Sequence, residues 1–220
     1  MRALILVDIQ NDFTPGEPGG ALAVPHGHDV ISVAIRLMPE FDLVVATQDW
    51  HPADHKSFAG HHAGKVVGDV VTLEGLDQIL WPDHCVQGTP GANFCDELNH
   101  AGIHEVVRKG TDSGIDSYSG FFDNGHRKAT GLDTVLQKHG VDALHIMGLA
   151  TDYCVKFTAL DAVELGFKTT LIVEGCRGVE LQAGDCDRAI EAMREAGVDI
   201  WTNTAPSESR IAAHHKRGES

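Results

Sequence analysis

The chain has 220 residues, enough for one large domain or two small ones, and 42% of them are hydrophobic, which excludes a globally disordered protein. Its 17 lysine and arginine residues against 32 aspartate and glutamate residues give a formal net charge of -15. This charge disfavours nucleic acid and anionic lipid as partners, and no basic stretch is dense enough to offset it.

The N-terminal apolar run, residues 3–7, ends at Asp8 and is too short for a secretory leader. No stretch of the chain is long enough to span a bilayer. The five cysteines are scattered, and their spacing matches neither a disulfide framework nor a C-x-x-C zinc site. We therefore expect a reduced, cytoplasmic protein without a membrane partner.

Apolar runs of strand length alternate with helical patterns along the chain. The predicted strands are residues 3–7, 43–46, 104–108, 143–149, 169–173 and 198–201. The predicted helices are residues 30–38, 131–139, 151–165 and 187–196. Continuous apolarity is typical of strands that are buried on both faces. The order predicts a three-layer, doubly wound α/β fold with a mostly parallel sheet of about six strands.

Two regions lack this alternation. Residues 50–100 are rich in His, Asp, Gly and Pro, and loops of that length are usually functional or disordered, so we expect a metal-binding loop region at about 49–95. Residues 204–220 are polar and have no hydrophobic period. We predict a single domain over residues 1–203 and a polar C-terminal tail after it, either a free extension or a partner-docking arm.

The carboxyl ends of the predicted strands carry polar residues, and ligands of such folds bind at that edge of the sheet. Asp8 follows the first strand, where an aspartate alone is more often a turn former than a catalyst. Lys109 follows the third strand, where a lysine usually extends to solvent. A buried lysine beside Asp8 and a thiol would instead tune the charge of both.

Asp49 and His51 follow the second strand and are two residues apart, so their side chains lie on one side of an extended chain. With His84 and His55 they form a carboxylate and imidazole set that suits a first-row metal ion with open positions. The pair alone fits a hydrogen-bonded surface loop equally well. Two adjacent histidines of the same loop are spare candidates, His61 and His62.

Cys154 lies at a predicted strand-to-helix junction. The free N–H groups of the first helical turn attract anions, lower the pKa of a nearby thiol and can hold an oxyanion. A buried, inert cysteine is the commoner interpretation of this residue taken alone. Because all these motifs fall at strand ends of one sheet, together they favour a cysteine hydrolase that acts on a small amide.

With these motifs, the chain resembles the nicotinamidase/pyrazinamidase branch of the isochorismatase-like cysteine hydrolases. The similar stretches cover most of the chain up to about residue 197: residues 3–13, 19–24, 44–51, 81–91, 109–110, 118–121 and 148–155. The chain departs from the pattern at Tyr153, where relatives vary, and over residues 55–81, which are longer than in the shortest relatives.

The resemblance implies a role for each motif. It implies a catalytic triad of Asp8, Lys109 and Cys154 and an oxyanion hole formed by the backbone of Ala150 and Cys154. It implies one divalent ion (Zn, Fe or Mn) on Asp49, His51 and His84, with His55 at a position that other members fill with water or a carboxylate. It also implies a non-proline cis peptide at residues 149–150. The substrate pocket would be lined by Phe13, Leu22, Trp81, Tyr118, Leu149 and Tyr153.

The activity implied by the resemblance is hydrolysis of nicotinamide, and of pyrazinamide, to the acid and ammonia through a cysteine thioester, in NAD salvage. The expected partner is this small amide, and the expected assembly is a monomer or small homo-oligomer. Two alternatives stay open. One is a related cysteine amidohydrolase that acts on a carbamoyl or ureido acid, and the other is a metal- or ligand-binding relative without turnover.

Overall fold

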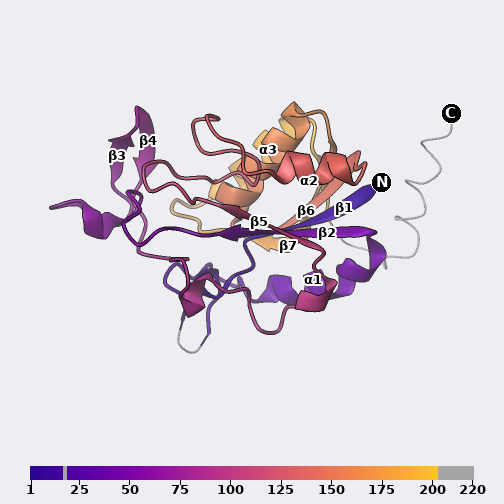
Figure 1. Ribbon diagram of the computed structural model, residues 1–220, viewed down its shortest axis with the longest axis horizontal. Coiled ribbons are helices and arrows are strands. Elements are labelled where there is room, and N and C mark those ends of the chain that lie inside the picture. Colours follow the sequence, from indigo (N-terminus) through magenta and orange to yellow (C-terminus); the bar gives the residue numbers. More distant parts are fainter. Residues whose placement is uncertain (17–18, 203–220) are drawn as a thin grey trace.

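The computed structural model describes residues 1–16 and 19–202, so the predicted tail, residues 204–220, lies outside the described residues. Six strands form one parallel sheet in the order β5-β2-β1-β6-β7-β8 (Figure 1). These strands are β1 (Arg2–Val7), β2 (Leu43–Asp49), β5 (Glu105–Lys109), β6 (Ala143–Leu149), β7 (Lys168–Arg177) and β8 (Asp199–Trp201). The doubly wound α/β prediction is confirmed.

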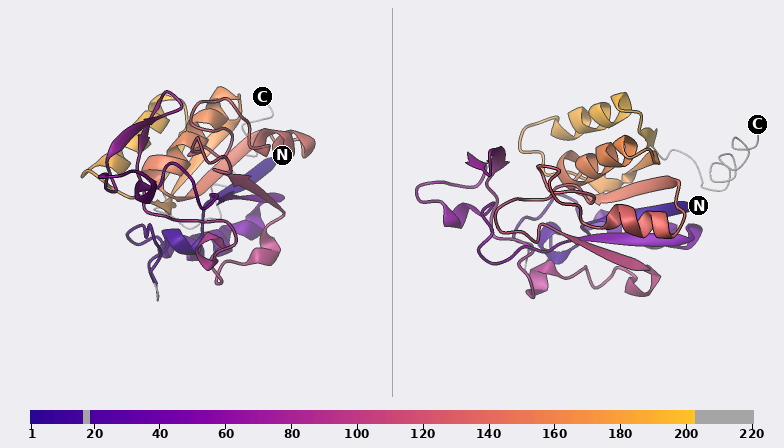
Figure 2. Two further views of the ribbon diagram at one scale, coloured as in Figure 1. Left: turned by 60° about the vertical axis from the view of Figure 1, so that its left-hand side comes forward. Right: turned by 45° about the horizontal axis from the view of Figure 1, so that its top comes forward.

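Helices cover both faces of the sheet. Helix α1 (Asp29–Leu37) lies on one face, and α2 (Leu132–Lys138), α3 (Lys156–Glu164) and α4 (Asp185–Glu195) lie on the other (Figures 1 and 2). In α1, Val30, Ile31, Ala34 and Leu37 recur at the helical period and are buried, whereas Ser32, Ile35 and Arg36 are exposed. Within the described residues, no helix is both long enough and apolar enough to cross a membrane.

The strands predicted at residues 43–46 and 169–173 extend several residues beyond their predicted carboxyl ends. The strand predicted at residues 43–46 runs on to Asp49, which pairs with Lys109 of β5. Thr47 and Gln48 in this extension are buried and hydrogen-bonded, so a hydropathy pattern ends before the ladder does. Similarly, β7 continues to Arg177, which pairs with Leu149 of β6.

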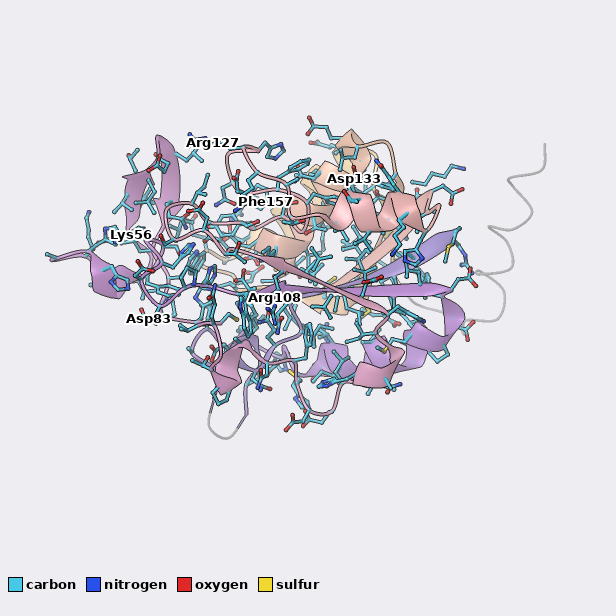
Figure 3. The ribbon with its side chains drawn as sticks, in the orientation of Figure 1. Lys56, Asp83, Arg108, Arg127, Asp133 and Phe157 are labelled. Atoms are coloured by element: carbon cyan, nitrogen blue, oxygen red, sulfur yellow. The ribbon has the colours of Figure 1, made fainter. Side chains whose placement is uncertain are left out.

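The irregular region contains a hairpin that the sequence pattern did not predict. Strands β3 (Val70–Leu73) and β4 (Leu76–Ile79) pair antiparallel around Glu74 and Gly75, which both have positive φ, as tight hairpin turns require. The hairpin projects from the end of the molecule opposite the N-terminus (Figure 1). The Arg127 guanidinium, which lies beside the hairpin in Figure 3, donates to the Glu74 carbonyl at 2.6 Å.

The order of the strands reverses between β1 and β6, which places a crevice at their carboxyl ends. A glycine makes this close pairing feasible. Gly148 has φ 130, and a Cβ at this position would collide with the Val7 carbonyl. Asp8 immediately follows β1 and Ala150 immediately follows β6, so residues that are far apart in the sequence meet at the switch point.

Candidate active site

Asp8 is held rigidly at the end of β1. Its Oδ1 accepts a hydrogen bond of 2.7 Å from the Thr47 hydroxyl, and its Oδ2 lies 2.9 Å from Lys109 Nζ. The Asp8 side chain is fully buried. Burial raises the pKa of Asp8 above its ordinary value, although Lys109 and the Thr47 hydroxyl partly offset the shift. Asp8 is therefore a better proton acceptor than a surface aspartate.

Lys109 connects the groups of the site. Its buried Nζ lies 2.9 Å from Asp8 Oδ2, 2.9 Å from Asp49 Oδ1 and 3.4 Å from Cys154 Sγ, and it donates to the Ser117 carbonyl at 2.9 Å. Burial disfavours the charge, but Asp49 and Asp8 outweigh it and hold the pKa of Lys109 well above its usual value. Within the predicted triad, the charged Lys109 ammonium therefore lies between Asp8 and Cys154 and contacts both.

Cys154 lies in a π-helical turn, Thr151–Val155, that leads into α3 and follows a cis peptide between Leu149 and Ala150. We expected the helix start to lower the pKa of this thiol, and the structure shows the reverse. Burial raises the pKa of Cys154 well above its usual value, Lys109 only partly lowers it, and nearby carboxylates raise it further. The thiol therefore requires a neighbouring base to become a nucleophile.

Asp49, His51 and His84 form a compact, buried group whose ligand atoms lie within 4.8 Å of one another. Asp49 Oδ2 is 3.0 Å from His51 Nε2 and 3.5 Å from His84 Nε2. The opposite ring nitrogens, Nδ1, lie 2.9 Å from the Gly110 carbonyl and 2.8 Å from the Pro82 carbonyl. Carbonyl partners make Nδ1 the donor in each ring, and each Nε2 faces the Asp49 carboxylate, so the three residues can turn their ligand atoms toward one divalent metal ion.

The electrostatics of this group also suit a cation. Burial opposes charge on His51, but Asp49 raises its pKa to about 9. Burial likewise opposes charge on Asp49, but His51 and Lys109 hold its pKa well below its usual value. A divalent ion bound here would compete with the proton that the raised pKa favours on His51.

His55 stands beside this group rather than within it. Its ring centroid is 4.3 Å from that of His51, and its ligand atom clusters with those of His51 and Asp116. His55 Nδ1 is 2.7 Å from the Ser57 hydroxyl. The other nitrogen, Nε2, is buried and has no hydrogen-bond partner among residues 1–16 and 19–202, so its lone pair is available to a metal ion.

The two spare histidines lie away from the metal-ligand group. His61 Nε2 is 3.0 Å from the Ala53 carbonyl, and His62 Nε2 is 2.7 Å from the Lys56 carbonyl. Both rings therefore bond the backbone of their own loop. Figure 3 shows Lys56 in this peripheral part of the molecule.

Aromatic side chains gather next to the nucleophile. The Tyr153 ring centroid lies 4.9 Å from that of Trp81 and 5.5 Å from that of Tyr118. Trp81 Nε1 donates to the Tyr118 hydroxyl at 3.1 Å, which fixes both rings. Phe13 contacts His84 edge-on at 5.4 Å. Of the other predicted pocket residues, Leu149 is fully buried and Leu22 is half-buried against the core.

Several residues that hold the candidate site in place were not predicted from the sequence. Thr47 bonds Asp8, Gln10 bonds both the N–H and the carbonyl of Asp49, and the Asp12 carboxylate accepts from Cys85 N at 2.7 Å, next to His84. Thr47, the polar residue that directly follows the apolar run 43–46, was an available signal for a buried hydrogen bond. Asp116 gave none, because an aspartate in a polar segment is usually solvated.

Comparisons with known proteins agree with this geometry. The model of the Isochorismatase domain matches residues 2–205. A nicotinamidase of Escherichia coli (strain K12) is 50% identical over 205 residues, which are 91% of this chain and 94% of that protein. The solved Acinetobacter baumanii nicotinamidase pyrazinamidease has a TM-score of 0.86 and 44% identity, covering 90% of this chain and 94% of that one. The pyrazinamidase of Pyrococcus horikoshii in complex with zinc has a TM-score of 0.72 and 36% identity, covering 92% and 99%.

Proposed function

The chain belongs to the isochorismatase domain family, and from this premise we propose that it is a nicotinamidase that hydrolyses nicotinamide to nicotinate and ammonia. Pyrazinamide, with a similar ring and the same carboxamide, is the proposed second substrate, and NAD salvage is the proposed role. The observation that carries this proposal is the Lys109 ammonium, which touches Asp8, Asp49 and Cys154 and so couples an acid-base group, a metal-ligand group and a nucleophile.

The proposed reaction begins with proton transfer from the Cys154 thiol to Asp8. Burial raises the pKa of both Asp8 and Cys154, so each group holds the proton more tightly than it would in water. The Lys109 ammonium stabilises the negative charge on whichever of the two has lost the proton. The thiolate attacks the carboxamide carbon and forms a tetrahedral oxyanion. We assign the backbone N–H groups of Ala150 and Cys154 as its donors, because Ala150 immediately precedes the turn that carries the nucleophile and Cys154 lies within it.

Collapse of this intermediate breaks the C–N bond. Asp8 returns its proton to the departing nitrogen, ammonia leaves, and a thioester to Cys154 remains. A water molecule then gives a proton to Asp8 and attacks the thioester carbonyl, which releases the acid and restores the thiol. General acid-base catalysis of this kind contributes about 10²–10⁴-fold.

We assign Asp49, His51 and His84 as ligands of a divalent ion, with His55 as the fourth protein ligand. The orphaned, buried Nε2 of His55 supports the fourth assignment, because coordination would satisfy it. When bound, the ion supplies a Lewis acid to which the ring nitrogen of the substrate can attach. Zn, Fe and Mn all suit such a donor set. The rings of Trp81, Tyr118 and Tyr153, with Phe13, are the proposed walls for a flat heteroaromatic substrate.

Ammonia release from nicotinamide by the purified protein tests the proposal, with a chelator-treated sample alongside. Release that stops on metal removal and returns on metal addition supports it. Absence of release from metal-loaded protein, with turnover of a carbamoyl or ureido acid instead, would favour the related amidohydrolase. Asp49→Ala should lose the metal, and an Asp49→Ala protein with full metal content would remove this residue from the ligand set.

We further propose that the protein acts in the cytoplasm as a monomer or small homo-oligomer, without a nucleic acid or membrane partner. The net charge of -15 supports the absence of nucleic acid. Size-exclusion chromatography with light scattering measures the assembly, and a mass that corresponds to a large ring or filament would contradict this expectation.

A further inference from the structure

A second cluster of metal-ligating side chains lies outside the active site. His126, from the loop between β5 and α2, faces Asp161 and Glu164 of α3, and the ligand atoms of the three residues lie within 4.8 Å of one another. Asp161 and Glu164 are three residues apart on a helix, so their carboxyl groups share one face. None of these residues takes part in the proposed hydrolysis.

Asp161 is the unusual member of this cluster. Its side chain is 8% exposed, and one oxygen, Oδ1, lies 3.2 Å from His126 Nε2. The other oxygen, Oδ2, is buried and makes no hydrogen bond of ordinary geometry with the residues that the structure describes, although the Ser119 hydroxyl is close enough to Asp161 to lower its pKa. A buried carboxylate oxygen without a well-placed donor is costly, and a cation is one way to satisfy it.

The electrostatic surroundings of Asp161 point the same way. Burial raises the pKa of Asp161, the Ser119 hydroxyl and His126 partly offset this shift, and the nearby charge of Glu164 adds to it. Two carboxylates that repel each other on one helix face would both gain from a divalent cation between them.

The His126 ring is held in place for such a role. Its backbone has φ 52, an uncommon conformation for a residue other than glycine, and its N–H donates to the Asp123 carbonyl at 2.9 Å. The imidazole stacks on Phe122 with ring centroids 4.8 Å apart. The ring thus packs on Phe122 on one side and faces the Asp161 carboxylate of α3.

We propose that His126, Asp161 and Glu164 form a second divalent-metal site, separate from the active site, for an ion of the zinc type. One imidazole and two carboxylates are suitable zinc ligands, and half-exposed His126 and exposed Glu164 leave the remaining positions open to water. An ion bound there would join the loop after β5 to α3. That loop also supplies Ser117, whose carbonyl accepts from Lys109 Nζ, and α3 begins just after Cys154.

Metal stoichiometry of the holoenzyme tests this site directly. The protein, loaded at its active site, is dialysed against increasing Zn²⁺, and bound metal is measured by plasma mass spectrometry. Wild type should bind about two ions per chain at saturation, and the Glu164→Gln and His126→Ala variants about one. The second ion should also raise the thermal midpoint of wild type and leave that of both variants unchanged.

Glu164→Gln replaces an exposed side chain by one of the same shape and keeps the contact between His126 and Asp161, so we expect this variant to fold like wild type. His139→Ala is the matched control. His139 Nε2 also faces a carboxylate, that of Glu105 at 3.6 Å, but this pair belongs to none of the three-ligand groups among the described residues. His139→Ala should therefore keep the second ion.

Two results would overturn the proposal. If wild type saturates at one ion, it has no second site. If the Glu164→Gln variant still binds two ions, the second ion must lie elsewhere. Asp49→Ala, which removes a proposed active-site ligand, should retain the ion on the α3 cluster. The readout is bound metal, so the outcome is independent of whether nicotinamide is the substrate.

Discussion

Replacing Thr47 with valine would isolate the control that one hydroxyl exerts on Asp8. The Thr47 hydroxyl donates to Asp8 Oδ1 at 2.7 Å, and both side chains are fully buried. A hydrogen bond to a charged group contributes roughly 1.5–3 kcal/mol, and one pKa unit corresponds to about 1.4 kcal/mol. Loss of this donor should therefore raise the pKa of Asp8 by roughly 1–2 units.

The sign of the effect on catalysis follows from the role proposed for Asp8. Only the carboxylate can accept the Cys154 proton, so activity rises with pH through the raised pKa of Asp8. In Thr47→Val the acid limb of the pH profile of kcat/KM should move to higher pH. On that limb, the rate at a fixed pH should fall about 10–100-fold relative to wild type, since each pKa unit is a factor of ten.

The assay is ammonia release from nicotinamide across the pH range, with metal content measured on the same samples. Thr47→Ser is the matched control, because it retains the hydroxyl at the same place in β2, and its acid limb should stay near that of wild type. An acid limb that is identical in Thr47→Val and wild type, with metal content equal, would show that this hydroxyl does not tune the catalytic base.

Three further substitutions test other parts of the site. Cys154→Ala should abolish turnover with metal content intact, and near-wild-type ammonia release would exclude it as the nucleophile. Gly110→Ala should bind metal about 10–100-fold more weakly in chelator competition, because φ is 63 and an added Cβ would press on the His51 ring; unchanged affinity would contradict this clash. Lys109→Met should lower the free energy of unfolding by about 3–5 kcal/mol in urea titration at neutral pH, since it leaves buried carboxylates unpaired. This deficit should shrink as pH falls and Asp8 is protonated, and a deficit independent of pH would argue that lost packing dominates.

The sequence by itself determined the fold class and predicted which residues gather at the candidate site. Apolar runs that are continuous over a strand length indicated strands buried on both faces, and each predicted strand is present in the sheet. Because parallel strands end at one edge, Asp8, Asp49, Lys109 and Cys154 were expected to meet there. These inferences succeed because burial patterns are local and repeat with the period of the element.

The tertiary structure alone decided which groups touch. Lys109 reaches Asp49, 60 residues away, and Cys154, 45 residues away, because strand order and register set β5 beside β2 and β6 beside β1. No periodicity encodes such contacts. The thiol pKa is a second case: a helix start alone lowers it, whereas burial beside carboxylates raises it. Desolvation depends on everything packed around a group, and only the folded chain contains that information.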